Sequence, residues 1–181
     1  MVSKFTHIIV TRVNVLRDDW TQDWLNDRLI IFKRFCYPTI YSQSNQNFKW
    51  IVFFSHRTPT SFQNEINKLK EGFPNFIPVF VTDYYYEYME VIKRYINKDS
   101  QFIITSRVDA DDGYALDYID EIQKVFYEVE PPVVINFNNG FIYNLEENKL
   151  FIRNHYTNAF CTLIERVEGF KSIWVTDHRE L

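Results

Sequence analysis

Cysteine is scarce in this sequence of 181 residues, which contains only Cys36 and Cys161. No metal-ligand spacing joins the two and both lie among apolar residues, so we interpret them as reduced core residues of a cytoplasmic protein. An excess of positive charge is also absent, because 20 Lys and Arg residues against 24 Asp and Glu residues give a net charge of −4. Nucleic-acid binding normally needs a clustered basic face, so this balance argues against a nucleic-acid partner.

The sequence also lacks a recognisable signal peptide and a membrane-spanning run. Its first residues, MVSKFTHIIVTRV, lead directly into an expected strand without a separate apolar leader. No apolar run approaches the length that crosses a bilayer. We therefore expect no membrane span, while an aromatic content of 18% leaves peripheral membrane contact open.

Strand and helix patterns alternate through the first two thirds of the chain. The expected strands, rich in β-branched and aromatic residues, are 5–13, 48–54, 76–81 and 102–107. The expected helices between them begin near Asp19, Thr58 and Asp83, and we expect Pro38 and Gly72 to end the first two. This alternation predicts an α/β fold with a mostly parallel central sheet flanked by helices, in a chain long enough for one domain.

The pattern changes in the C-terminal half, after the helix that follows the fourth strand. The expected elements there are a strand at 133–137, a small antiparallel hairpin through 141–143 and 150–153, a helix at 157–165 and a final strand at 171–175. The last strand leads to Asp177 and His178.

An acidic motif follows the fourth expected strand, in the run QFIITSRVDADDGY. Asp109, Asp111 and Asp112 come directly after the strand, at the edge of the sheet where ligands of open α/β folds bind. Three carboxylates so close together repel one another at neutral pH unless a cation lies among them. Their oxygens suit Mg²⁺ or Mn²⁺ that also contacts the phosphates of a substrate.

Two other interpretations of this motif exist. Asp and Gly favour turns, and an Asp before a helix is a common N-cap, so we expect Asp111 or Asp112 to cap the following helix. A calcium loop counted from Asp109 needs Gly at its sixth position and Glu at its twelfth, where this chain has Tyr114 and Asp120. The spacing thus excludes the calcium loop and leaves a metal–phosphate site and a capped turn both open.

The whole chain from Thr11 to His178 resembles the family of putative rhamnosyltransferases, glycosyltransferases of the GT-A type. The segments that carry the resemblance are TRVNV, Trp24, Arg28, FCYPTIYSQSNQNFKWIVFF, TP, TSRVDADDG, INFNNG, NAFCTLIE and VTDH, in this order. The resemblance implies one GT-A domain over 1–181, with a nucleotide-binding half at about 1–113 and an acceptor-side half at about 114–181. It also implies a nucleotide-sugar donor and a glycan-type acceptor.

The resemblance further implies a DxD-type metal site. Asp109, Asp111 and Asp112 would bind a divalent cation, Mn²⁺ or Mg²⁺, that bridges the two phosphates of the donor. His178 would supply a third metal or phosphate contact, for which a neutral imidazole is a competent ligand. The alternative for His178 is an exposed residue in a frayed tail.

A nucleotide pocket is implied at the end of the first strand, lined by Thr11, Arg12 and Asn14. Arg107 can pair with a phosphate, since a planar guanidinium suits bidentate contacts, or with a neighbouring aspartate. Where family members often carry an acidic residue after the second strand, this chain has Ser55, His56 and Arg57, which leaves the contact to the nucleotide base open.

Glu165 is the candidate general base for an inverting reaction, in which a carboxylate within reach of the acceptor hydroxyl accepts its proton. It precedes the final expected strand, so we expect it to face the same site. A plain surface glutamate is the alternative, and a retaining reaction needs no such base.

Three functions remain open for this sequence. The first is a metal-dependent glycosyltransferase that uses a rhamnose or other hexose donor. The second, a nucleotidyltransferase, is disfavoured because TRVNVLRDD has no glycine for a phosphate-binding loop. The third is a non-catalytic relative that binds a sugar or nucleotide or acts as a scaffold.

Overall fold

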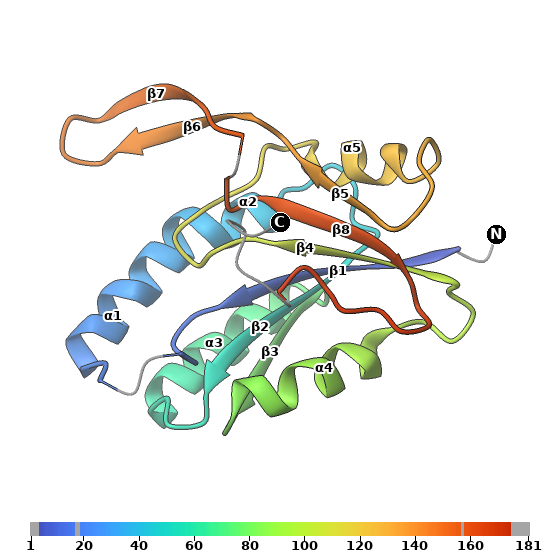
Figure 1. The fold of residues 1–181 in the computed structure, drawn as a ribbon. Coiled ribbons are helices and arrows are strands. Elements are labelled where there is room, and N and C mark those ends of the chain that lie inside the picture. Colours follow the sequence, from blue (N-terminus) through green and yellow to red (C-terminus); the bar gives the residue numbers. More distant parts are fainter. Residues whose placement is uncertain (1–3, 17–18, 157, 175–181) are drawn as a thin grey trace.

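The computed structural model describes residues 4–16, 19–156 and 158–174 and shows an α/β fold (Figure 1). Its elements are β1 (Phe5–Arg12), α1 (Gln22–Ile31), the π-helix η1 (Phe32–Cys36), α2 (Tyr37–Tyr41), β2 (Lys49–Ser55), α3 (Thr60–Gly72), β3 (Phe76–Val81), α4 (Tyr84–Tyr95), β4 (Phe102–Arg107), α5 (Tyr118–Val125), β5 (Val133–Asn136), β6 (Asn139–Asn144), β7 (Lys149–Asn154) and β8 (Cys161–Arg166).

Six strands form the central sheet, in the order β3-β2-β1-β4-β8-β5. The first four are parallel to one another, whereas β8 runs antiparallel to both β4 and β5. The predicted mostly parallel sheet is therefore confirmed. Because β1 and β4 are adjacent, the loops that follow them leave the same edge of the sheet.

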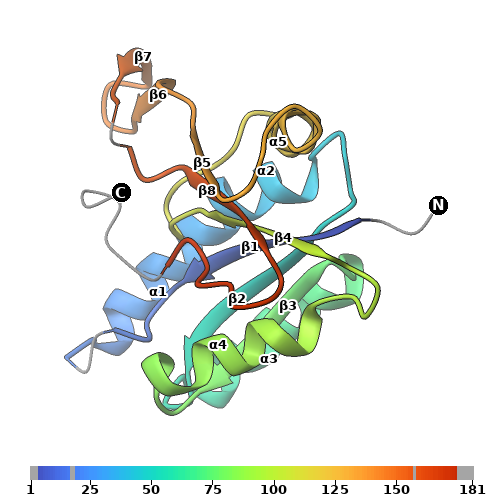
Figure 2. The ribbon, with the colours of Figure 1, turned by 45° about the vertical axis from the view of Figure 1, so that its right-hand side comes forward.

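Helices and irregular chain cover the two faces of this sheet (Figure 2). The larger core lies under α1, η1, α2, α3 and α5 and includes the fully buried Trp50 and Phe32. The smaller core lies under α4 and the segment 170–174, and includes Phe53 and Ile92. Continuous apolar strands such as β2 are expected when both faces of a parallel sheet are covered.

The hairpin predicted in the C-terminal half is confirmed. Strands β6 and β7 pair antiparallel as a separate two-stranded sheet that extends away from the central sheet (Figure 1). Tyr143 contacts Phe35 of η1, with 6.2 Å between the ring centroids.

Pro38 does not end the first helix, contrary to the prediction. The helix passes from α1 through the π-turn η1 into α2. Pro38 comes directly after the π-turn, in which Tyr37 N donates to the Phe32 carbonyl oxygen five residues earlier. Proline has no N–H to donate, and the altered hydrogen bonding of the π-turn lets the helix continue past it. The start of α3 was also predicted wrongly: Pro59 is its N-cap residue, and the Thr58 hydroxyl accepts a hydrogen bond from Asn14 instead.

The prediction of a helix at 157–165 is wrong, because β8 occupies most of this range. Thr162 to Glu165 pair with β4, and this pairing completes the sheet between β4 and β5. Pairing with strands that are distant in the sequence can override the local helical preference of a segment. The final strand expected at 171–175 is also absent within its described part, 171–174.

Candidate functional site

The carboxyl ends of β1 and β4 meet at one edge of the sheet, where Val10 is paired with Arg107 and accepts a hydrogen bond from Val108 N at 3.3 Å. The segments leaving the two strands line an open pocket of about 250 Å³. Its charged residues are Arg12, Arg28, Asp109 and Asp111, and its apolar residues are Val13, Val15, Leu16 and Ala110. The end of β1 and the acidic turn therefore share one concavity that has side chains of both charges.

The three aspartates lie in one tight turn, closed by a hydrogen bond from Asp112 N to the Asp109 carbonyl oxygen at 3.1 Å. Helix α5 starts at Tyr118, after Asp117, so neither Asp111 nor Asp112 caps it and that expectation is wrong. The acidic turn therefore does not cap α5.

Gly113 lets this turn approach α2. A Cβ atom at position 113 would lie 2.7 Å from Thr39 Oγ1 and 2.8 Å from Thr39 Cγ2. Thr39 Oγ1 accepts a hydrogen bond from Tyr114 N at 3.2 Å and donates one to the Cys36 carbonyl oxygen at 2.9 Å. The acidic turn is thus attached to α2 at a position where only glycine fits without displacement.

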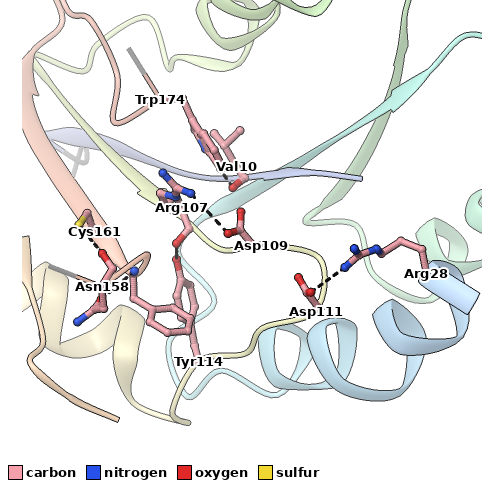
Figure 3. Close-up of polar contacts among 10 residues, drawn as sticks. Val10, Arg28, Arg107, Asp109, Asp111, Tyr114, Asn158, Cys161 and Trp174 are labelled. Carbon is pink, nitrogen blue, oxygen red and sulfur yellow. Dashed lines mark hydrogen bonds and ion pairs between the residues drawn. The ribbon is translucent and has the colours of Figure 1, made fainter. Parts of the chain in front are cut away.

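Two of the aspartates are paired with arginines (Figure 3). Asp111 Oδ2 lies 2.7 Å from Arg28 Nη1 of α1. Asp109 Oδ2 lies 3.4 Å from Arg107 Nη2, which is longer than the roughly 2.7–2.9 Å of a good charge-assisted hydrogen bond. In Figure 3 the two carboxylates point to different partners. The carboxylate of Asp111 is therefore directed towards α1, and the positive charge of Arg107 is only weakly compensated by Asp109.

The carboxyl group of Asp112 has a pKa raised to about 6. Burial is the largest cause, the charges of Asp111 and Asp109 act in the same direction, and Arg107 and Arg28 oppose it. The folded protein therefore resists ionisation of Asp112.

These residues fit a divalent cation in donor chemistry, as all three supply hard carboxylate oxygens. Within the described ranges, however, no three or more His, Cys, Asp or Glu side chains are gathered in a way that could hold a metal ion. The three aspartates therefore supply suitable donor atoms, but the described residues do not gather them into a metal site.

Trp174 lies beside two of the arginines of the site, Arg12 and Arg107. The guanidinium carbon of Arg12 is 3.5 Å from the centroid of its ring and that of Arg107 is 4.0 Å away. Its Nε1 donates to the Val10 carbonyl oxygen at 3.3 Å (Figure 3). Trp174 was not among the predicted site residues, because no motif or spacing links position 174 to positions 12 and 107.

Thr11 and Asn14 are brought to this edge of the sheet but are used for structure. Thr11 is fully buried, and its hydroxyl accepts a hydrogen bond from Trp50 Nε1 at 2.9 Å. The Asn14 amide donates to Thr58 Oγ1 at 3.1 Å and accepts from Ser55 N at 2.9 Å. Of the three residues expected to line a nucleotide pocket, Arg12 is the one that lines the concavity at the ends of β1 and β4.

Glu165 is not brought to the acidic turn. It is paired with Ile103, near the start of β4, whereas Asp109 follows the end of that strand. Its carboxylate oxygens accept hydrogen bonds from Lys171 N at 3.0 Å and Ser172 N at 2.9 Å. His178 lies outside the described residues.

The described helices include none that is both long and apolar enough to cross a membrane. No curated protein shows significant similarity to the chain. The family described as "Putative rhamnosyl transferase" matches it over residues 10–181, nearly the whole sequence and all of the site. On this match, the chain belongs to that rhamnosyl transferase family.

Proposed function

We propose that this protein transfers rhamnose or another hexose from a nucleotide-sugar donor to a hydroxyl group of a glycan-type acceptor, in a reaction that depends on Mn²⁺ or Mg²⁺. Membership of the family supports the class of reaction. The observation that carries the assignment is the pocket at the ends of β1 and β4, where Arg12 and Arg28 lie with Asp109 and Asp111. A nucleotide-sugar needs both charges, since its diphosphate is an anion and the cation it binds needs carboxylates.

The arginines would bind the diphosphate group. Arg12 and Arg28 line the pocket, and planar guanidinium groups suit the paired oxygens of phosphates. Phosphate binding by Arg28 would release Asp111 from its ion pair. The carboxylates of Asp109, Asp111 and Asp112 would then all be available on the same turn.

These three aspartates would hold the cation together with phosphate oxygens. A bound Mn²⁺ or Mg²⁺ would stabilise the negative charge that develops on the diphosphate as the sugar leaves. Glu165, whose carboxylate is bonded to the backbone of Lys171 and Ser172, would have to give up both bonds to act as a general base.

A thermal-shift screen of nucleoside diphosphates and nucleotide-sugars, each with and without Mn²⁺, tests this proposal. A ligand that binds the folded state raises the melting temperature. We expect a metal-dependent shift for one nucleotide class and its loss in Asp112→Asn. The control is Asp99→Asn, an exposed aspartate in the loop before β4, which should shift as the wild type does.

A transfer assay completes the test. We expect the nucleoside diphosphate of the donor found in the screen to be released when an acceptor is present. The absence of any nucleotide shift, or an unchanged Mn²⁺-dependent shift in Asp112→Asn, would contradict the proposal.

A non-catalytic binding protein is the second candidate, favoured by one observation: Glu165 and Asp111 are both engaged in contacts within the protein. It predicts a nucleotide-dependent thermal shift without release of nucleoside diphosphate in the transfer assay. Release that needs Asp112 would exclude it.

A further inference from the structure

The chain returns to the site after β8 through an irregular segment, Phe170–Trp174. Strand β8 runs away from the carboxyl edge of β4, and this return segment then brings the chain back towards that edge, to Trp174 (Figure 1). It lies on the face of the sheet covered by α4. We call Phe170–Trp174 the return segment below.

Side chains, rather than a neighbouring strand, hold the backbone of the return segment. Glu165 accepts hydrogen bonds from the N–H groups of Lys171 and Ser172, and Thr105 Oγ1 accepts one from Ile173 N at 2.9 Å. The Ser172 hydroxyl is also hydrogen-bonded to the Tyr88 hydroxyl of α4. Three successive N–H groups are therefore fixed by two buried side chains.

Ser172 has a φ angle of 71°, in the left-handed region that favours glycine. A non-glycine residue stays in this region only when the surrounding contacts hold it there. The bonds from Glu165 and Tyr88 supply those contacts. The anchoring thus fixes the end of the segment, where Trp174 lies.

Trp174 in turn fixes two arginines. The guanidinium groups of Arg12 and Arg107 both lie within 4.0 Å of the centroid of its ring, so they are close neighbours of like charge. Stacking on an aromatic face offsets part of this repulsion. Burial lowers the pKa of the Arg12 guanidinium, and the charge of Arg107 contributes in the same direction.

The arginine pair lacks a full set of acceptors. Arg107 is only 5% exposed, and its buried Nε has no hydrogen-bond partner in the described structure. Its contact with Asp109 Oδ2, at 3.4 Å, is long. The hydroxyl of the buried Tyr84, whose ring centroid lies 5.7 Å from the Arg12 guanidinium carbon, also has no partner within the described chain. Unsatisfied buried donors of this kind are costly unless a ligand supplies the acceptors.

We propose that Trp174 is a positioning residue that holds Arg12 and Arg107 together as a receptor for a diphosphate group, with Glu165 as the anchor of the return segment. This inference rests on the proposed function, because a nucleotide-sugar supplies the diphosphate. The binding itself is a property of these residues and needs no metal ion.

Titration with inorganic pyrophosphate in the presence of EDTA, followed by calorimetry, isolates this site from the cation. We expect the wild type to bind pyrophosphate, and Trp174→Ala to bind it about tenfold or more weakly. This is the size of effect expected if one arginine loses a well-placed charged hydrogen bond to the ligand. Trp174→Phe keeps an aromatic ring against both arginines and should retain most of the affinity. Glu165→Gln should weaken binding while Trp174 itself is unchanged.

A purely structural role for Trp174 predicts a different result. Phe170→Leu is the matched control, since Phe170 is buried in the same segment and the same core but lies outside the arginine pair. It should lower the melting temperature without changing the affinity for pyrophosphate. Equal affinity of folded Trp174→Ala and wild type, or no binding by the wild type, would overturn the inference.

This test separates the two proposals. Pyrophosphate binding that depends on Trp174 without any nucleotide-sugar transfer would support the receptor and reject the transferase. Transfer by the wild type, together with pyrophosphate binding that is indifferent to Trp174, would reject the receptor alone.

Discussion

Arg28 and Asp111 form an ion pair of 2.7 Å that joins helix α1 to the acidic turn. The pair is partly exposed, with 26% of the Arg28 side chain and 51% of the Asp111 side chain accessible, so solvent screens it and its effect on stability is at most about 1 kcal/mol. Under the proposed function, the pair also occupies a carboxylate that would bind the cation.

Replacing Arg28 by Gln should therefore separate cation binding from phosphate binding. Without the competing guanidinium, Mn²⁺ alone should bind the acidic turn a few-fold more tightly, whereas a nucleoside diphosphate should bind more weakly. Electron paramagnetic resonance of free Mn²⁺ and calorimetry with the nucleotide measure the two effects. The exposed Arg34→Gln is the control and should change neither, and a loss of both affinities in Arg28→Gln would contradict this prediction.

Replacing Asp112 by Asn should stabilise the protein in the absence of metal. Burial raises the pKa of this carboxyl group to about 6 from 3.8, so the folded state resists its ionisation. Stability is lost as the pH rises from 3.8 to about 6, and removing the charge should recover about 1–3 kcal/mol at neutral pH. Urea unfolding in EDTA measures the gain. A destabilised Asp112→Asn would indicate that this carboxylate has a structural role instead.

Replacing Gly113 by Ala should displace the acidic turn. The added Cβ would meet Thr39 at 2.7–2.8 Å, and overpacking of this kind typically costs about 1–3 kcal/mol. Thermal unfolding measures the loss, and nucleotide binding should fall with it. The control is Gly72→Ala, where a Cβ would meet nothing within 4 Å. Equal stability of the two variants would show that Thr39 moves aside freely.

Local signals in the sequence were sufficient for much of the fold. The third strand was predicted with the bounds of β3, and Asp83 caps α4 through hydrogen bonds from Tyr85 N and Tyr86 N. Both predictions depend on a few adjacent residues, a β-branched run in one case and an N-cap in the other. The position of the acidic motif after β4 was predicted in the same way.

Long-range contacts explain the features that local patterns did not predict. Strand β8 is stabilised by its pairing with β4. The return segment is held by Thr105, which lies 68 residues before Ile173. Trp174 donates to Val10, 164 residues earlier. The role of Glu165 depends on these same contacts. A local sequence pattern does not indicate which distant strand will complete a sheet, or which distant side chain will accept a hydrogen bond from a backbone N–H group.

The buried His7 makes stability depend on pH. Its Nε2 is 2.9 Å from Ser106 Oγ, and its Nδ1 is 3.1 Å from the amide nitrogen of Gln123. Because an amide nitrogen only donates, Nδ1 must accept, and Nε2 carries the proton of a neutral ring. Burial lowers the pKa of His7 from 6.5 to about 3, since the charged ring would lose water and face a donor.

Stability should therefore fall as the pH drops below 6.5. Above that pH the imidazole is neutral in both states, whereas between 6.5 and about 3 the unfolded chain binds a proton that the folded protein does not. One such proton lowers the free energy of unfolding by up to about 1.4 kcal/mol per pH unit. Urea unfolding of His7→Gln and wild type across this range measures the difference between their slopes.

The variant should show the shallower loss of stability towards low pH, even if its stability at pH 7 is lower. Asp112 changes the stability in the opposite direction over part of this pH range. Because it is present in both proteins, its contribution cancels when their slopes of stability against pH are compared. Parallel slopes for His7→Gln and wild type would mean that the buried ring accepts a proton in the folded state, and that the Gln123 amide turns to present its oxygen.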